Sequence, residues 1–181
     1  MAETTSATIT GFTIKYNGTT ISSPPSTCPS SSSAVSITAS GSGTITLSFS
    51  LIVDTEYDNN IYSTFSGTVS IYWEHCNSAV TVYTSGASAS TSVSVEDANG
   101  YSYTLDSQYW SATWHNDNTT ATAGTFKRLG YIDISASNLM NTIQWDFTIT
   151  IPVDGTLWDA STDPEKDGIL FYVVASGQVN P

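Results

Sequence analysis

The sequence predicts an all-β protein, an antiparallel two-sheet β-sandwich of about ten strands with an immunoglobulin-like or jelly-roll topology. Apolar and polar residues alternate with a period of two along most of the chain, and helical periodicity is almost absent. Turn-forming residues separate the alternating runs at intervals typical of a sandwich. Because the alternation leaves one side of each strand polar, we expect antiparallel sheets with one face in water.

The N-terminal part of the chain predicts a strand followed by a hairpin. Asn17-Gly18 is a strong signal for a two-residue type I′ turn, which would set Ile14 opposite Ile21 on one face. Gly11 interrupts the alternation before this hairpin, which predicts a β-bulge or a hinge. Residues 22–33 are rich in Pro and Ser and predict an extended surface connection. We therefore divide the chain into residues 1–33, this strand, hairpin and connection, and residues 34–181, the sandwich domain.

The remaining strands follow from the same alternation. At Asn99-Gly100 a three-residue loop with a left-handed Gly100 gives the better register, because it pairs Val95 with Tyr103 and Val93 with Leu105. Pro152 marks the end of a strand or an edge position. The predicted strands are Val35–Ala39, Ile45–Val53, Phe65–Trp73, Val80–Val82, Val93–Val95, Tyr101–Leu105, Trp110–Trp114, Ile132–Ile134, Ile143–Val153 and Ile169–Ala175.

The charge balance excludes several classes of partner. The sequence has sixteen acidic and only four basic residues, which gives a net charge of −12. Binding to a nucleic-acid backbone or to an anionic membrane surface requires Lys and Arg, so neither partner is expected. No apolar run reaches the roughly 20 residues of a transmembrane helix. Only 11 % of residues are charged, while Ser and Thr fill about a third of the chain, so hydroxyl groups supply most of its polarity.

The cysteines and sequons favour an extracellular location. Cys28 and Cys76 fit neither a CxxC metal site nor a redox pair, so we expect one long-range disulfide, with two buried free thiols as the alternative. Asn17 and Asn118 each begin an Asn-x-Thr sequon in a turn-like context, as in an exported glycoprotein. The first residues have neither a basic nor an apolar segment of a signal peptide. Either a leader has been removed, or the chain leaves the cell in a virion.

Two groups of residues are candidates for ligand binding. Asp54, Glu56 and Asp58 place carboxylates at alternate positions, as in calcium loops, and a second acidic segment spans residues 154–167. Ordinary solvated acidic loops are the favoured explanation of both segments, with calcium as the alternative, and no other cofactor is expected. Trp110 and Trp114 share one strand face, which is typical either of a sugar-stacking platform or of core packing.

No catalytic set is apparent in the sequence. His75 and His115 are the only histidines, and neither belongs to a nucleophile motif. His75 and Cys76 are adjacent, so in a strand they point to opposite faces and do not form a copper site. No carboxylate pair for glycoside hydrolysis stands out. We therefore expect a protein that is not an enzyme.

These observations favour a structural subunit of a self-assembling extracellular filament. An N-terminal strand with a glycine break and a long connection behind it is suited to donation, in which a strand is added to a neighbour's sheet. In this pattern the first thirty or so residues resemble donor-strand pilins and other β-sandwich filament subunits of prokaryotic surfaces, without a diagnostic motif. An ordinary intramolecular hairpin is the alternative for this segment. The donor residues would be Thr4, Thr5, Ala7, Ile9, Phe12 and Ile14.

Two other functions remain open at this point. A virion capsid, spike or decoration protein would explain the missing leader. A secreted carbohydrate-binding or adhesive module, with glycans as partners, would require Trp110 and Trp114 to lie in solvent.

Overall fold

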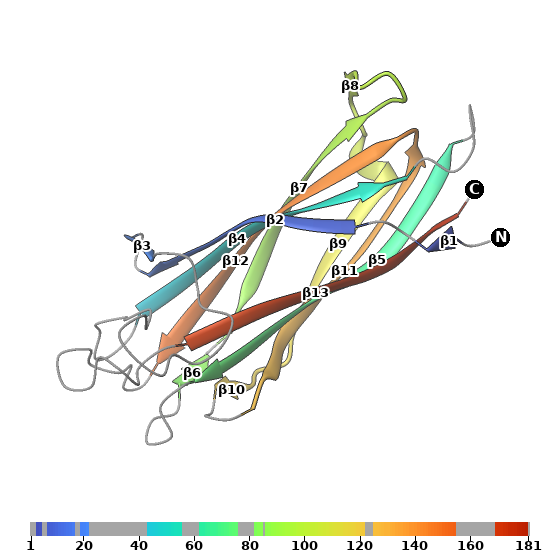
Figure 1. The fold of residues 1–181 in the computed structure, drawn as a ribbon. Helices are drawn as coiled ribbons and strands as arrows, with labels where there is room; N and C mark the ends of the chain where they lie inside the picture. The colour runs from blue at the N-terminus through green and yellow to red at the C-terminus, as the bar shows by residue number, and fades with distance from the viewer. Residues whose placement is uncertain are drawn as a thin grey trace.

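The fold is a sandwich of two antiparallel sheets. The computed structural model describes residues 3–4, 7–16, 19–21, 43–55, 62–75, 82–84, 86–121, 125–154 and 169–180. Every strand pair in these ranges is antiparallel. The predicted all-β sandwich is therefore confirmed, and Figure 1 shows its two layers. Among the described residues, no helix has the length and apolar character needed to span a membrane.

One sheet has five strands. Their order across the sheet is β1-β13-β5-β11-β9, with the long strands β13, β5 and β11 in the middle. β5 and β13 pair without interruption over their full overlap. The β5–β11 ladder shifts register twice, between Arg128 and Gly130 and between Ala136 and Leu139. The bounds are β1 Glu3–Thr4, β5 Ser63–His75, β9 Trp110–Asn116, β11 Lys127–Leu139 and β13 Ile169–Asn180.

The second sheet has eight strands. Its main path is β10-β6-β12-β4-β2-β3, and β7 pairs with β12 and with the short β8. Pro152 falls between the β12–β7 ladder, which ends at Thr150, and the β12–β6 ladder, which begins at Val153. Proline, which has no backbone N–H, therefore lies at a break in the pairing of β12 with the described strands on that side. The bounds are β2 Ala7–Tyr16, β3 Thr19–Ile21, β4 Gly43–Asp54, β6 Val82–Thr84, β7 Ser88–Glu96, β8 Ser102–Tyr103, β10 Thr120–Ala121 and β12 Thr142–Asp154.

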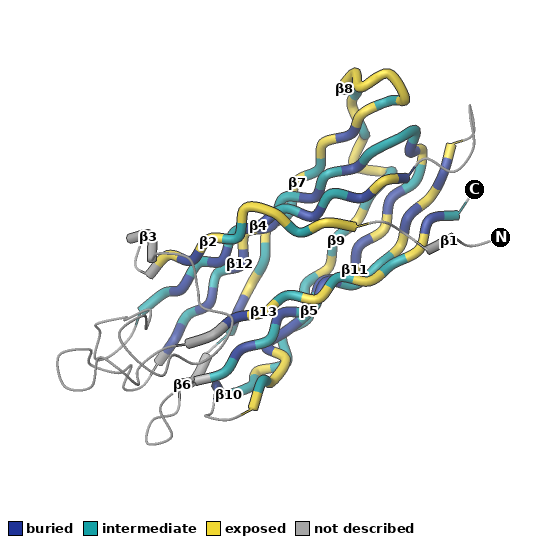
Figure 2. Tube along the Cα trace, viewed as in Figure 1, coloured by how far each residue is buried: buried dark blue, intermediate teal, exposed yellow. Residues whose placement is uncertain are grey.

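The core fills the space between the two sheets. Figure 2 shows buried and exposed residues alternating along the long strands, as the period of two requires. The largest fully buried side chains include Trp73, Trp145 and Phe147. On the five-stranded sheet, Gly67 and Gly177 are cross-strand partners, and the ring of Phe65 lies where their Cβ atoms would be. This glycine pair leaves room for an aromatic ring against the backbone.

The predicted turns are largely confirmed. β2 and β3 pair with Ile14 opposite Ile21, as the two-residue Asn17-Gly18 turn requires. Gly100 has a φ of +81°, and Val95 lies opposite Tyr103. The second predicted pair of that hairpin, Val93 with Leu105, does not form, because β8 ends at Tyr103 and a 3₁₀ turn follows at Ser107–Tyr109. The predicted strand at Val35–Ala39 lies outside the described residues.

Candidate functional site

The N-terminal strand lies at the edge of both sheets of its own chain. β1 pairs with the end of β13, with Glu3 opposite Val179 and Thr4 opposite Gln178. After Thr5 and Ser6 the chain enters the other sheet, where β2 pairs along β4. Of the predicted donor residues, Thr4 therefore lies on the five-stranded sheet, Ala7 to Ile14 lie on the eight-stranded sheet, and Thr5 lies outside the described residues.

Three side chains attach β2 to the core. Ile14 is only 1 % exposed, and Ile9 and Phe12 are partly buried against the core. The ring of Phe12 stacks on that of Phe49 with 5.9 Å between centroids and 26° between planes. These contacts fill the rim of the sandwich beside β4. Whichever chain supplies this strand, the three side chains close the same part of the core.

Gly11 divides β2 into two halves. Its φ is +67°, and the register with β4 shifts between Thr10 and Thr13. The bulge or hinge predicted from the sequence is therefore present. No atom lies within 4 Å of the position a Cβ would occupy, so glycine is required here by the backbone conformation and not by lack of space.

The outer edge of β13 is the longest unpaired edge in the described part of the chain. On one side β13 pairs with β5 from Ile169 to Asn180, and on the other it pairs with β1 only at Gln178 and Val179. Residues 169–177 therefore have no strand partner on that side among the described residues. Near the middle of this edge, Tyr172 is 48 % exposed and Val174 is 39 % exposed.

The opposite rim of the sandwich is closed differently. There β9 and β7 are the edges of the two sheets, and the indole Nε1 of Trp114 donates a hydrogen bond to the backbone oxygen of Ala87 at 2.8 Å. β8 also covers the end of β7, where Val95 and Glu96 are paired. This rim is held together by side-chain packing and a hydrogen bond between the sheets.

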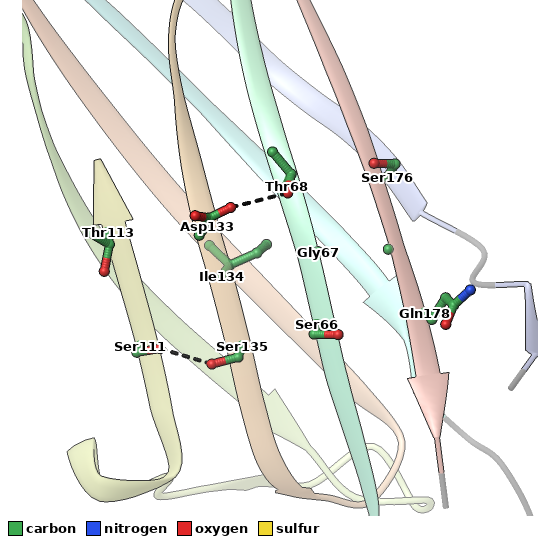
Figure 3. A pocket seen from close by; sticks show the side chains of 11 residues that line it. Ser66, Gly67, Thr68, Ser111, Thr113, Asp133, Ile134, Ser135, Ser176 and Gln178 are labelled. Carbon is green, nitrogen blue, oxygen red and sulfur yellow. Dashed lines mark hydrogen bonds between the residues drawn. The ribbon is translucent and has the colours of Figure 1, made fainter. Parts of the chain in front are cut away.

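The outer face of the five-stranded sheet carries a shallow hollow of about 480 Å³. Figure 3 shows that most of the side chains around it are small and hydroxylated, which is why the surface is recessed. Thr68 Oγ1 donates to Asp133 Oδ1 at 3.2 Å, and Asp133 Oδ2 lies 3.0 Å from Nε2 of His115. Two cross-strand rows form most of the lining: Ser176, Thr68, Asp133 and Thr113, then Gln178, Ser66, Ser135 and Ser111.

Aromatic rings occupy one end of this face. Tyr172 contacts Tyr72 across the strands, with centroids 5.1 Å apart, and Phe126 meets Tyr172 edge-on at 5.4 Å. Next to them the guanidinium of Arg128 lies 4.3 Å from the ring centre of Tyr131. The Nε of Arg128 also donates to Asp117 at 2.7 Å, and this hydrogen bond raises the pKa of Arg128. The face therefore combines rings and hydroxyl groups with few unpaired charges.

The two tryptophans considered as a sugar platform belong to the core side of β9. Trp110 meets Trp145 edge-on, with ring centroids 6.2 Å apart, and both Trp110 and Trp114 pack against the buried cluster. Neither stands free in solvent as a stacking platform requires, so their geometry favours the core interpretation. On the other side of the same sheet Tyr172 is exposed and contacts the half-buried Tyr72, and the alternation of the sequence did not single out this pair.

The other predicted site residues are only partly placed. Cys28, Cys76, Asn17, Glu56 and Asp58 lie outside the described residues, so the disulfide, one sequon and most of the calcium loop stay predictions.

Two of the predicted residues are visible at the surface. Asn118 is exposed, with a φ of +53° and its Oδ1 accepting a hydrogen bond from Asn116 at 2.9 Å. Asp54 is exposed at the end of β4. Within the described ranges, no three His, Cys, Asp or Glu residues cluster in a way that suits a metal ion. Comparison with known proteins finds no matching family model, no matching curated protein and no matching solved structure.

Proposed function

We propose that this chain is a non-enzymatic structural subunit of a self-assembling extracellular filament, in which each copy places its N-terminal strand on the β4 edge of the next. The observation that carries the proposal is the position of β2: it is an edge strand whose side chains fill the rim of the core. An edge strand can be replaced by the same strand from another copy without rearranging any strand between other partners.

The exchange conserves the stabilising contacts. Burial of an isoleucine contributes roughly 1.5–3 kcal/mol, so the rim vacated by Ile14 would be costly to leave empty. A second copy of β2 brings the same Ile14, the same Phe12 ring for Phe49, and the same backbone hydrogen bonds to β4. The exchanged and unexchanged states therefore differ little in their local contacts, and the balance depends on subunit concentration.

The chain between the hairpin and β4 is long enough for exchange. β3 ends at Ile21 and β4 begins at Gly43, which leaves residues 22–42 as the connection. Twenty-one residues reach at most roughly 70 Å when fully extended. With the two cysteines unpaired, that reach allows the β2–β3 hairpin to dock on a neighbouring copy while its own sandwich stays intact. If the predicted Cys28–Cys76 disulfide forms, residues 22–27 alone give a reach of roughly 20 Å from Cys28.

Head-to-tail donation is a heterologous contact, and such contacts produce open filaments unless the rotation between subunits closes a ring. The alternative setting is a virion, in which the same exchange would link coat subunits into a closed shell. Electron microscopy of the assembled protein separates an open filament from a closed shell.

An engineered disulfide tests the exchange directly. Thr8 of β2 lies opposite Ile52 of β4, and neither is fully buried, so cysteines at both positions would sit side by side. If the strand is donated, oxidation of the Thr8→Cys/Ile52→Cys variant should give a ladder of covalent oligomers on a non-reducing gel. If the strand stays on its own chain, the same variant should give only a monomer with an internal disulfide, which would contradict the proposal.

Matched controls separate the engineered bond from the native cysteines. The single variants Thr8→Cys and Ile52→Cys carry one added thiol each and should give no ladder. The wild-type chain reports any linkage made by Cys28 and Cys76. Removal of residues 1–10 or 1–16 should shorten or abolish filaments under the electron microscope. The second deletion should have the larger effect, because it also removes Ile14 and Phe12.

Carbohydrate binding is a second candidate, supported by the outer face of the five-stranded sheet. The hydroxyl-lined hollow lies on the same sheet as the exposed ring of Tyr172, which is four residues along β13 from the lining residue Ser176. A face that combines rings with hydroxyl and carboxylate groups suits a neutral sugar chain. If the face binds glycans, Tyr172→Ala and Asp133→Asn should both reduce binding on a glycan array. Tyr101→Ala, which removes an exposed ring on a remote loop, should leave it unchanged; equal loss in all three variants would count against the site.

A further inference from the structure

The open edge of β13 has none of the features that normally prevent strand addition. Soluble proteins protect long edges with charged side chains, proline, bulges or short strand length. Residues 169–180 contain no charged residue and no proline. The register of β13 with β5 runs from Ile169 to Asn180 without a bulge, so the strand is long and regular.

The other long edges in the described part of the chain are shorter or interrupted. The β2 edge carries the Gly11 bulge and Lys15, and β3 covers its last residues. Because β8 pairs only with Val95 and Glu96, the β7 edge is open over residues 88–94, and the outer edge of β9 spans residues 110–116; both are shorter than the open part of β13. Among the described strands, β13 therefore has the longest regular open edge, at which a further strand can make the most backbone hydrogen bonds.

We propose that the partner at this edge is β13 of a second copy, paired antiparallel about a two-fold axis near Val173. The unpaired backbone groups of an edge need an extended strand, and a second β13 supplies one of matching length. Because β13 is uncharged, two copies can lie side by side without like charges facing each other, although each chain has a net charge of −12. An isologous contact of this kind is closed and stops at two copies.

One register uses the whole open segment. With Val173 on the axis, residue 169 of one copy lies opposite residue 177 of the other, just before the residues that β1 covers. In that register Tyr172 lies opposite Val174 of the second copy, and both are the exposed apolar side chains of the edge. A cross-strand aromatic and β-branched pair is favourable in antiparallel sheets.

The lateral pair adds a second contact to the proposed self-assembling subunit and rests on that proposed function. The two contacts use different sheets. The N-terminal exchange concerns β2 and β4, whereas the lateral pair concerns β13. Each can therefore fail without the other.

Mixed cross-linking tests the register. Copies carrying Tyr172→Cys are mixed with copies carrying Val174→Cys and oxidised under mild conditions. We expect the mixture to give a disulfide dimer of one copy of each variant, and each variant alone to give much less. A single strand pair is a small interface, and cross-linking detects it even when the dimer is weak. Thr148→Cys, exposed on the central strand β12, is the matched control and should not cross-link.

A second pair of variants tests the strongest competitor for this edge. If β1 of another copy continued along β13 in its present register, Thr10 would lie opposite Tyr172. Strong cross-linking of Thr10→Cys copies with Tyr172→Cys copies, without the 172–174 dimer, would overturn the proposal in favour of a donated N-terminal strand. Absence of both products would overturn it in favour of an edge that stays unpaired.

A third variant tests the contact without cysteines. Val174→Lys places a charge on the exposed edge, and because Val174 is 39 % exposed the fold should tolerate it. Sedimentation should then show loss of the dimer at concentrations where the wild type associates, and an unchanged dimer would contradict the inference. A ladder from Thr8→Cys/Ile52→Cys with no 172–174 dimer would mean that the exchange holds and the lateral pair does not. The reverse result would mean that only the lateral pair holds.

Discussion

Two edge strands, β2 and β13, lie on the same side of the sandwich and differ in almost every property that governs edge pairing. Only Thr5 and Ser6 separate β1, which pairs with β13, from β2, so the two edges are neighbours in space (Figure 1). β2 is bulged at Gly11, carries Lys15 and is partly covered by β3. β13 is regular and uncharged, and among the described residues its outer side has no strand partner over residues 169–177.

The difference separates two ways of joining subunits. The side chains of β2 complete the core, so a strand from a neighbouring copy can occupy this position only by replacing β2. β13 already pairs with β5 on one side, and its residues Phe171 and Val179 are buried in the core. Its outer edge can therefore only receive a further strand. Replacement suits head-to-tail donation, and addition suits a two-fold pair.

We expect the largest effect from removing the buried side chain of Ile14, which attaches β2 to the core. Ile14→Ala deletes a side chain that is 1 % exposed and should lower the free energy of unfolding by about 2–5 kcal/mol. Urea denaturation of the purified subunit measures the loss, and Thr13→Ala, at the exposed neighbouring position, is the control. A loss in Ile14→Ala no greater than in the control would show that β2 does not fill the core.

A smaller change acts on the bulge of β2. Gly11→Ala adds a methyl group that meets no atom within 4 Å, so its cost comes from the φ of +67° alone. A non-glycine residue in the left-handed region costs about 1–2 kcal/mol, and asparagine tolerates it better. Denaturation should therefore rank the stabilities as wild type, then Gly11→Asn, then Gly11→Ala. Equal stability of all three would mean that the strand adopts a different backbone at this position.

Local patterns predicted the positions of most described strands and several of their registers, but not all of their lengths: β7 and β11 run well beyond the predicted Val93–Val95 and Ile132–Ile134. The Asn17-Gly18 turn gives the Ile14–Ile21 pair because a two-residue loop allows one register only. Gly11 and Gly100 stand out because glycine interrupts a strand or follows a turn residue where left-handed backbone is needed. These features depend on residues a few positions apart, which is why the sequence alone predicts them.

The edges and the outer face depend on contacts between distant parts of the chain. Tyr72 and Tyr172 meet only because β5 and β13 pair, and no spacing in the sequence relates them. For the same reason the alternation at Trp110 indicated one strand face without showing that Trp145 of the other sheet covers it. The absence of charge in residues 169–180 was visible, but its meaning depends on β13 lying at an edge.

We expect the smallest effect on stability from Tyr103, which lies in β8 and not in either edge strand. A variant at this position therefore serves as a control for the variants of β2 and β13. The hydroxyl of Tyr103 in β8 donates to the backbone oxygen of Asn138 and accepts from the backbone N–H of Met140, both at 3.3 Å. Desolvation by burial raises the pKa of Tyr103 above 10.0, although the bond from Met140 acts in the opposite direction. The unfolded chain therefore loses this proton at a lower pH than the folded chain, and the stability from the neutral hydroxyl is lost as the pH rises beyond 10.0.

Tyr103→Phe should remove this dependence. The difference in urea midpoint between wild type and Tyr103→Phe should shrink from about pH 9 to about pH 11, where the wild type loses the advantage of its hydroxyl. All other residues are the same in the two proteins, so their contributions cancel in the difference. Filament formation and the 172–174 cross-link should be unaffected at neutral pH, because β8 contacts neither β2 nor β13 in the sheet pairing. A difference that stays constant with pH would mean that the Tyr103 hydroxyl titrates alike in the folded and unfolded chains.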